Sequence, residues 1–317
     1  MFSTFIASQY LGGFQAMKKA KIHKEGNMKK RLYPNYLCIP ALFVYGVFFV
    51  MPVLFGFVLS FTDWHITRIL EPRWNGISNF QVLLQDRHFS TALQNTLSFA
   101  LVTTVFIVII GIILAVLLSR PVWGQTFFRT IFFLPAVLSL IVVGLIFIAV
   151  FRLDGLFNQI LGFFGVNENP IDWLGTASTA LGTTKVAHIW RWSGFAMAIF
   201  IAGIQGISSE YYEAAEIDGA NGIQRFKFIT FPLIAPAFTV AVTINLIGSL
   251  RVFEQVFVMT NGGPGNASQV LGTFIFGTFS QGLLGRSTAM GLMLFALITV
   301  ISVPLTKLLR AREAHLT

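Results

Sequence analysis

Residues that could carry chemistry are few and scattered in this 317-residue chain. The single cysteine, Cys38, excludes an internal disulfide and a cysteine-based zinc site. The five histidines form no His-x-x-x-His pair, and no clustered nucleophile set is present in the sequence. The run Gly262-Gly263-Pro264-Gly265 lacks the lysine of a phosphate-binding loop. We therefore expect no catalytic residue, no metal site and no cofactor bound by this chain.

A small group of polar residues lies inside segments that are otherwise apolar. His188, Arg191 and Trp192 lie near the start of one segment. Asn245 and Ser249 lie four residues apart in another, and so on one helix face. An arginine at the centre of a membrane helix costs about 2.5–3.5 kcal/mol on insertion scales, which suggests a functional reason for such residues. Aromatic faces and planar polar groups bind sugars, so these five residues are a candidate substrate pathway.

The same region also allows a structural interpretation. Trp190 and Trp192 lie near a membrane interface, where an aromatic belt is expected. Arg191 can extend its charge to the interface from so near a helix end. Arg191 and Arg251 can indicate an acidic sugar or a phosphorylated polyol, or they can pair with Glu254 or a partner subunit. The sequence leaves these alternatives open.

The elements that must position these residues are membrane-spanning helices. The chain is 55% hydrophobic and only 11% charged, whereas soluble domains have about 25% charged residues. A helix of about 20 apolar residues crosses the roughly 30 Å hydrocarbon core. We therefore expect an all-α membrane protein with six transmembrane helices. The six segments of sufficient length are 37–61, 97–118, 130–151, 186–207, 233–250 and 287–306.

Lysines and arginines near the helix ends predict the orientation. Most of the 22 basic residues lie before the first segment, after the last, or in the second and fourth connections. Both termini are therefore expected in the cytoplasm, and the net charge of +9 reflects this orientation and not nucleic-acid binding. The expected parts are a basic cytoplasmic tail (1–36), the first transmembrane helix (37–61), an extracytoplasmic loop (62–95), a core of five helices (96–310) with a cytoplasmic loop at 208–232, and a C-terminal tail (311–317). The first 27 residues can form an interfacial helix or a flexible tail, and Met28 is an alternative start.

The loop between the fourth and fifth segments is too polar to span a membrane and too patterned for a plain linker. Ser208 or Ser209 can cap a short helix with acids near its start, and Gly219 is a natural stop. A second short helix is expected at 223–230, and Pro232 should reset the chain before the next span. Two short helices fixed to two spans would form a knob that a soluble partner can push. The alternative is a solvated loop whose acids only satisfy local helix ends.

This loop resembles the EAA loop of binding-protein-dependent ABC importer permeases. The similarity runs from Glu213 to Ala220 and continues at Phe226, Ile229, Pro232 and Pro236. Outside the loop, segments similar to the carbohydrate-uptake branch lie at 128–130, 133–135, 172–174 and 260–264. The last of these looks like the maltose-type subunit that pairs with a second, related permease. The N-terminal 30 residues lie outside the resemblance.

The resemblance implies the type I ABC importer permease fold and a transport subunit without its own ATPase site. The residues it implies for coupling to a cytoplasmic ATPase are Glu213, Ala214, Ala215, Asp218, Gly219, Phe226 and Pro232. It aligns His188, Arg191, Trp192, Asn245 and Ser249 with the sugar site of maltose-type relatives. The implied partners are a second homologous permease, two cytoplasmic ATP-binding subunits that use the ATP, an extracytoplasmic solute-binding protein and the lipid bilayer.

We therefore expect a permease subunit of an ATP-driven importer of a sugar or oligosaccharide in the bacterial inner membrane. One alternative is the same architecture importing glycerol phosphate, an amino acid or a peptide. Another is an ion-coupled secondary transporter, which would need carboxylates in mid-span. None of the 13 acidic residues lies there.

Overall fold

The computed structural model describes residues 35–120, 123–166 and 169–313. Most of the expected basic tail and the last four residues of the chain lie outside these ranges. The chain divides into two compact units, Met1–Val58 and Leu59–Thr317. Each unit is described by itself.

The described part of the first unit is an apolar helical segment that continues to Leu59. A 3-10 turn leads into α2 (Ile39–Tyr45), which is followed by a π-helical turn (Gly46–Val50) and α3 (Met51–Leu59). The π-helical turn ends two residues before Pro52. Proline has no N–H and its ring collides with the carbonyl four residues earlier in an α-helix, so the wider turn accommodates it.

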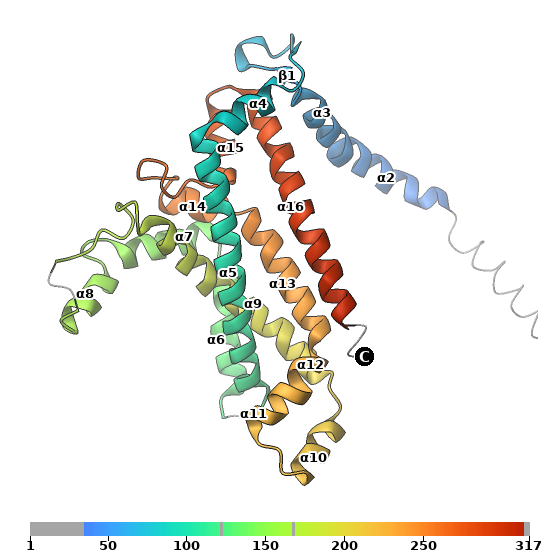
Figure 1. Cartoon of the computed structure of the whole chain (residues 1–317), viewed down its shortest axis with the longest axis vertical. Helices are drawn as coiled ribbons and strands as arrows, with labels where there is room; N and C mark the ends of the chain where they lie inside the picture. The colour runs from blue at the N-terminus through green and yellow to red at the C-terminus, as the bar shows by residue number, and fades with distance from the viewer. Residues whose placement is uncertain (1–34, 121–122, 167–168, 314–317) are drawn as a thin grey trace, which may run out of the picture. The chain divides into compact units, whose positions relative to one another are not determined.

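Four long helices form the body of the second unit (Figure 1). These are α5 (Arg87–Ser119), α9 (Ala180–Gln205), α13 (Ala235–Leu250) and α16 (Leu284–Glu313). α5 packs along both α9 and α13, and α16 packs on the other side of α13. α9 and α13, which carry the candidate substrate residues, therefore lie in contact at the centre of the bundle.

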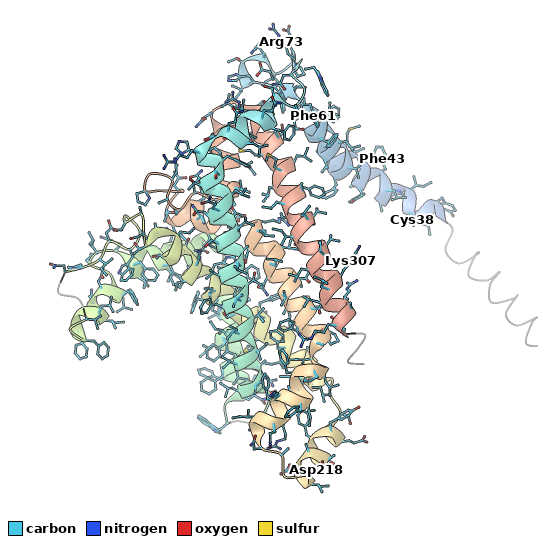
Figure 2. The ribbon with its side chains drawn as sticks, in the orientation of Figure 1. Cys38, Phe43, Phe61, Arg73, Asp218 and Lys307 are labelled. Carbon is cyan, nitrogen blue, oxygen red and sulfur yellow. The ribbon has the colours of Figure 1, made fainter. Side chains whose placement is uncertain are left out.

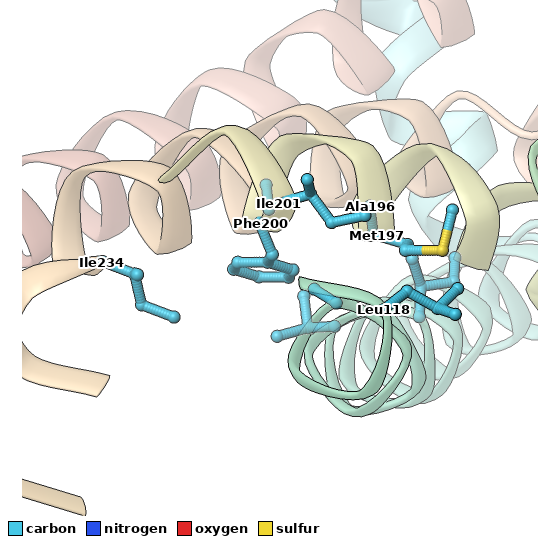
Figure 3. Packing of buried hydrophobic residues seen from close by; sticks show 10 residues of the cluster. Leu118, Ala196, Met197, Phe200, Ile201 and Ile234 are labelled. Carbon is cyan, nitrogen blue, oxygen red and sulfur yellow. The ribbon is translucent and has the colours of Figure 1, made fainter. Parts of the chain in front are cut away.

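Small residues allow the helices to approach closely. A Cβ atom added at Gly111 in α5 would lie 2.7 Å from the Cβ of Ala196 in α9. A Cβ added at Gly203 would lie 2.6 Å from the Cβ of Ala237 in α13. Membrane helices associate through such close packing, because lipid removes the hydrophobic force between them. The apolar core beside these contacts includes Leu118, Ala196, Met197, Phe200, Ile201 and Ile234 (Figure 3).

Short elements lie at the two ends of this bundle. At one end are β1 (Thr62–Asp63), a 3-10 turn (Ile66–Arg68), β2 (Arg73–Trp74), α4 (Ser78–Gln85), α14 (Glu254–Met259) and α15 (Leu271–Ser280). At the other end are α10 (Ser209–Ile217), α11 (Gly222–Arg225) and α12 (Phe231–Leu233). To the side of the bundle are α6 (Gln125–Val137), α7 (Leu140–Phe151) and α8 (Leu156–Phe163).

The segment expected as an extracytoplasmic loop, 62–95, contains a short β-hairpin and a helix, which the Asn79 side chain joins. β1 and β2 pair antiparallel, with Thr62 opposite Trp74. The Asn79 side chain in α4 donates to the carbonyl oxygens of Ser60 at 2.8 Å and Thr62 at 2.9 Å. This part of the chain is therefore a small packed cap that also contains the first residues of α5.

The predicted all-α membrane class is confirmed. Within the described ranges, five helices are long and apolar enough to cross a membrane, and a bent pair brings the number to six if it is one span. The bent pair joins Gly222–Leu233 to Ala235–Leu250 at an angle of 70°. The sequence placed this bend at Pro232, but the helix continues through Pro232 and bends at Ile234. Pro232 follows a π-helical turn at Phe226–Thr230, and this wider turn accommodates a proline inside a continuous helix.

The third predicted span, 130–151, is not one continuous helix. α6 ends at Val137 and α7 begins at Leu140, and Leu138 and Ser139 have extended backbone between them. Pro135 lies in the last turn of α6 and weakens it by removing a backbone donor. Both flanking helices are apolar, so the hydrophobic pattern does not reveal the break. The segment that meets the length of a span here is Leu140–Phe163.

Candidate functional site

The first arm of the 208–232 loop begins and ends at the residues that the sequence indicated. Ser208 caps α10 and its hydroxyl accepts a hydrogen bond from the N–H of Glu210 at 3.4 Å. Gly219 follows the helix with φ of +72°. The N–H of Ala220 donates to the carbonyl of Ala215 at 2.8 Å, which closes the helix in the manner favoured by glycine.

The second arm is a helix with an unpredicted cap. Asn221 and Gln224 cap α11 reciprocally, each side chain accepting from the other's backbone N–H at 2.9 and 2.8 Å. The helix continues through a π-helical turn at Phe226–Thr230 into α12. As in the first unit, this π-helical turn ends two residues before a proline.

Two side-chain contacts join the arms. The Tyr212 hydroxyl of α10 lies 3.0 Å from the hydroxyl of Thr230. An Arg225 nitrogen lies 3.6 Å from a carboxylate oxygen of Glu216. Together with the caps, these contacts hold the two short helices at a set angle, which is what the knob interpretation of the sequence required. Figure 2 shows Asp218, between the arms, at the extreme end of the second unit.

The surface of this loop combines acids with exposed apolar side chains. Of the predicted coupling residues, Glu213, Ala214, Asp218 and Gly219 are exposed, and Ala215, Phe226 and Pro232 are half-buried. The sequence interpretation missed a set of large apolar side chains on the same loop: Tyr211, Ile217, Ile223 and Phe228, of which Ile217 is 88% exposed. Exposed apolar groups rimmed by polar ones mark a protein contact. The signal was available, because these residues stand among polar neighbours in the sequence.

A cavity of about 260 Å³ lies between α7, α9, α13 and α14. Three of the five predicted substrate-pathway residues line it: His188 and Trp192 from α9, and Asn245 from α13. Gln255 and Glu254 at the start of α14 also line it, together with Arg251. The sequence interpretation did not place Gln255 there, because nothing in the sequence indicated that α14 turns back against α9.

Ser249 does not line the cavity but supports a residue that does. A hydrogen-bonded chain crosses three helices: Thr103 of α5 donates to Ser249 of α13 at 2.9 Å, and Ser249 lies 3.3 Å from Nε2 of His188 in α9. Phe99 packs its ring against the imidazole with a centroid separation of 5.1 Å. This chain holds the imidazole in place at the cavity wall.

Two buried polar atoms in this wall have no partner within the described part of the chain. They are Nδ1 of His188 and Oε1 of Gln255. Gln255 is 1% exposed, and its amide nitrogen contacts the sulfur of Met259 at 2.9 Å. An unpaired buried polar group costs about 1–3 kcal/mol, so these two atoms are a polar part of the wall that the described chain leaves unsatisfied.

Residues 107–313 match the family model for the binding-protein-dependent transport system inner membrane component. The chain belongs to this family. The permease is 33% identical to the trehalose/maltose transport system permease protein MalF of Thermococcus litoralis, over 88% of this chain and 94% of that protein. It is 35% identical to the multiple sugar-binding transport system permease protein MsmF of Streptococcus mutans, over 88% and 95% of the two chains.

The fold has solved counterparts. A chain of a bacterial ABC transporter involved in the import of the acidic polysaccharide alginate matches this permease with a TM-score of 0.78. The match covers 91% of this chain and 99% of that one at 23% sequence identity. The expected importer-permease fold is therefore confirmed, as is a transport permease located in the inner membrane.

Arg191 has a role that the sequence did not indicate. The residue is only 8% exposed, and its Nη2 donates to the carbonyl oxygen of Leu138 at 2.9 Å and of Ala136 at 3.5 Å, while Nε and Nη1 are buried without a partner in the described part of the chain. These carbonyls belong to the break between α6 and α7. The guanidinium also lies 4.7 Å from the ring centre of Trp192. Arg191 therefore does not line the cavity, and it contacts both the broken span of the permease and the ring of Trp192.

Proposed function

We propose that this permease forms half of the translocation pathway of an ATP-driven, binding-protein-dependent importer of a sugar or oligosaccharide. The observation that carries the proposal is the cavity between α9, α13 and α14, which the polar side chains of His188, Asn245 and Gln255 line beside the ring of Trp192. A sugar offers hydroxyls to such side chains and a C–H surface to such a ring. The permeases named above, which transport trehalose, maltose or multiple sugars by name, support the same substrate class.

The charges around the cavity favour a neutral sugar over an acidic one. Arg251 and Glu254 both line the cavity, so the lining carries both signs. Arg191 does not line the cavity, and its Nη2 donates to the carbonyls of the broken span. Among the described lining residues, the cation Arg251 is therefore accompanied by the acid Glu254. This arrangement disfavours selection of a carboxylate or phosphate on the substrate.

The 208–232 loop is the proposed contact with the motor of the importer. Its exposed apolar residues and acids would dock in a cytoplasmic ATPase, with Glu213 and Asp218 at the surface and Gly219 setting the turn. ATP-driven closure of two ATP-binding subunits would then move the permease and a second homologous permease between inward-open and outward-open states. ATP would be used by those subunits, and this chain would bind no cofactor. An extracytoplasmic binding protein would deliver the sugar.

The proposed orientation puts both termini and this loop in the cytoplasm. Within the second unit, α16 runs toward the end of the bundle that carries α10, α11 and α12 (Figure 1). Arg310 and Arg312 lie in its last turn, as the distribution of positive charge predicts for a cytoplasmic end.

Reconstitution tests the proposal. Vesicles that contain this permease with its co-purified permease, ATPase and binding protein should accumulate a labelled sugar only when ATP is supplied. Vesicles that contain this chain alone should accumulate nothing. Uptake by the chain alone would refute the proposal in favour of a secondary transporter, and ATP-driven uptake of amino acids or peptides in place of sugars would refute the substrate class.

A further inference from the structure

A second cavity, of about 450 Å³, lies where α5 ends beside the 208–232 loop, the proposed coupling loop. Its polar lining consists of Ser119, Arg120, Tyr212, Arg225 and Thr230, with the backbone of Gly222, and its apolar lining of Val116, Ile204 and Phe226. It shares no lining residue with the substrate cavity. It therefore joins the end of an apolar span to both arms of the loop.

The lining is strongly positive. Arg120 and Arg225 are its charged residues, and no carboxylate lines the cavity within the described ranges. Nε of Arg225 is buried without a hydrogen-bond partner there. Glu216 lies outside the cavity at 3.6 Å from Arg225, too long for a good charge-assisted hydrogen bond, and its own side chain is 76% exposed.

The carbonyl end of α5 does not neutralise this charge, because other residues already satisfy it. The Arg129 guanidinium donates to the carbonyl of Leu118 at 2.6 and 3.1 Å, and the amide of Gln125 donates to the same oxygen at 2.7 Å. The side chain of Arg120 has no such partner in the described structure. A Cβ at Gly222 would lie 3.6 Å from its Nη2, so this guanidinium reaches across to the start of α11.

Hydroxyl groups complete the lining. Those of Tyr212 and Thr230 lie 3.0 Å apart, and the hydroxyl of Ser119 is at the end of α5. Hydroxyls can donate to an anion or accept from one another, so they adapt to a ligand without leaving an unpaired group.

We propose that this cavity binds a phosphate group and thereby connects the end of α5 to the coupling loop. Two guanidinium groups and three hydroxyls in one cavity match the chemistry of a phosphate, which arginine binds through paired N–H donors. The end of a membrane span is where basic pockets meet lipid headgroups, and a soluble phosphate ester presents the same chemistry. Bound phosphate competes with Glu216 for Arg225, so the ligand replaces a weak contact between the arms with a bridge to the bundle.

Binding to the full chain purified in detergent tests the proposal independently of transport. The first assay measures equilibrium binding of labelled inorganic phosphate. The second assay measures, by native mass spectrometry, retention of phosphatidylglycerol after passage through nanodiscs that also contain phosphatidylcholine. Arg120→Gln and Arg225→Gln should each weaken binding at least about tenfold, as expected for a lost charge-assisted pair. Arg310→Gln, an exposed arginine of α16 outside the cavity, is the matched control and should bind as the parent does.

Glu216→Gln removes the competing carboxylate and should strengthen binding by up to about fivefold. A misfolded variant cannot produce this gain. Binding of inorganic phosphate supports a soluble ligand, and retention of phosphatidylglycerol alone supports a lipid headgroup. If neither assay detects binding, or if Arg310→Gln loses as much binding as the two cavity variants do, the proposal is overturned.

Discussion

Gly219 joins the two arms of the 208–232 loop in a left-handed conformation, with φ of +72°. A Cβ added there would meet no heavy atom within 4 Å. A substitution is therefore opposed by the backbone and not by a steric clash in this chain. The left-handed region costs a residue with a side chain about 1–2 kcal/mol relative to glycine.

This cost acts on the geometry of the loop. The hydrogen bonds from Ala220 to Ala215 at 2.8 Å and from Gly219 to Glu216 at 3.1 Å both require the left-handed residue. A penalty of 1–2 kcal/mol shifts the equilibrium away from this turn by a factor of about 5–30. Membrane insertion should not change, because Gly219 lies outside every candidate span.

A graded series separates backbone strain from side-chain size. Asparagine tolerates the left-handed region, alanine does so less well, and a β-branched valine is the least compatible. ATP-driven uptake in vesicles should therefore decrease in the order Gly219, Gly219→Asn, Gly219→Ala and Gly219→Val, with the Val variant inactive. Immunoblots of the membrane fraction should show equal amounts of all four.

Full uptake by Gly219→Val would refute the coupling role of the turn. If Gly219→Asn were as inactive as Gly219→Val while Gly219→Ala retained uptake, side-chain bulk against a partner would explain the loss, and the argument from backbone strain would be wrong.

Four other substitutions test the rest of the structure. Trp192→Ala and Asn245→Ala should raise the KM of sugar uptake severalfold, and unchanged uptake in both would favour a purely structural role for these residues. Arg191→Met should lower the free energy of unfolding by about 1.5–3 kcal/mol, since the charged hydrogen bonds to the broken span are lost; thermal unfolding in detergent measures this, and an unchanged midpoint would contradict it. Asn158→Leu should destabilise the fold by about 1–3 kcal/mol, because this side chain donates to three backbone carbonyls beside α8; the same unfolding assay applies, and parent-like stability would show that solvent replaces those bonds.

Local sequence signals were sufficient to predict where the first helix of the 208–232 loop begins and ends. Ser208 caps a helix because its hydroxyl reaches a backbone N–H two residues on, and Gly219 ends it because glycine enters the left-handed region at little cost. The apolar length of the spans is likewise a local property. The bend at Ile234 was misplaced because Pro232 was taken as a break, whereas the π-helical turn before it lets the helix continue through the proline.

The amino-acid sequence by itself determined the membrane class, the approximate spans and the two-armed loop, since each depends on residues within a few turns of one another. Only the tertiary structure decided which polar residues share a wall. His188 and Gln255 line the same cavity because α14 turns back against α9. Arg191 does not line it, and its guanidinium instead donates to a carbonyl of the broken span between α6 and α7. The free energy of a buried polar group depends on partners that are distant in the chain, so no local pattern could have predicted these assignments.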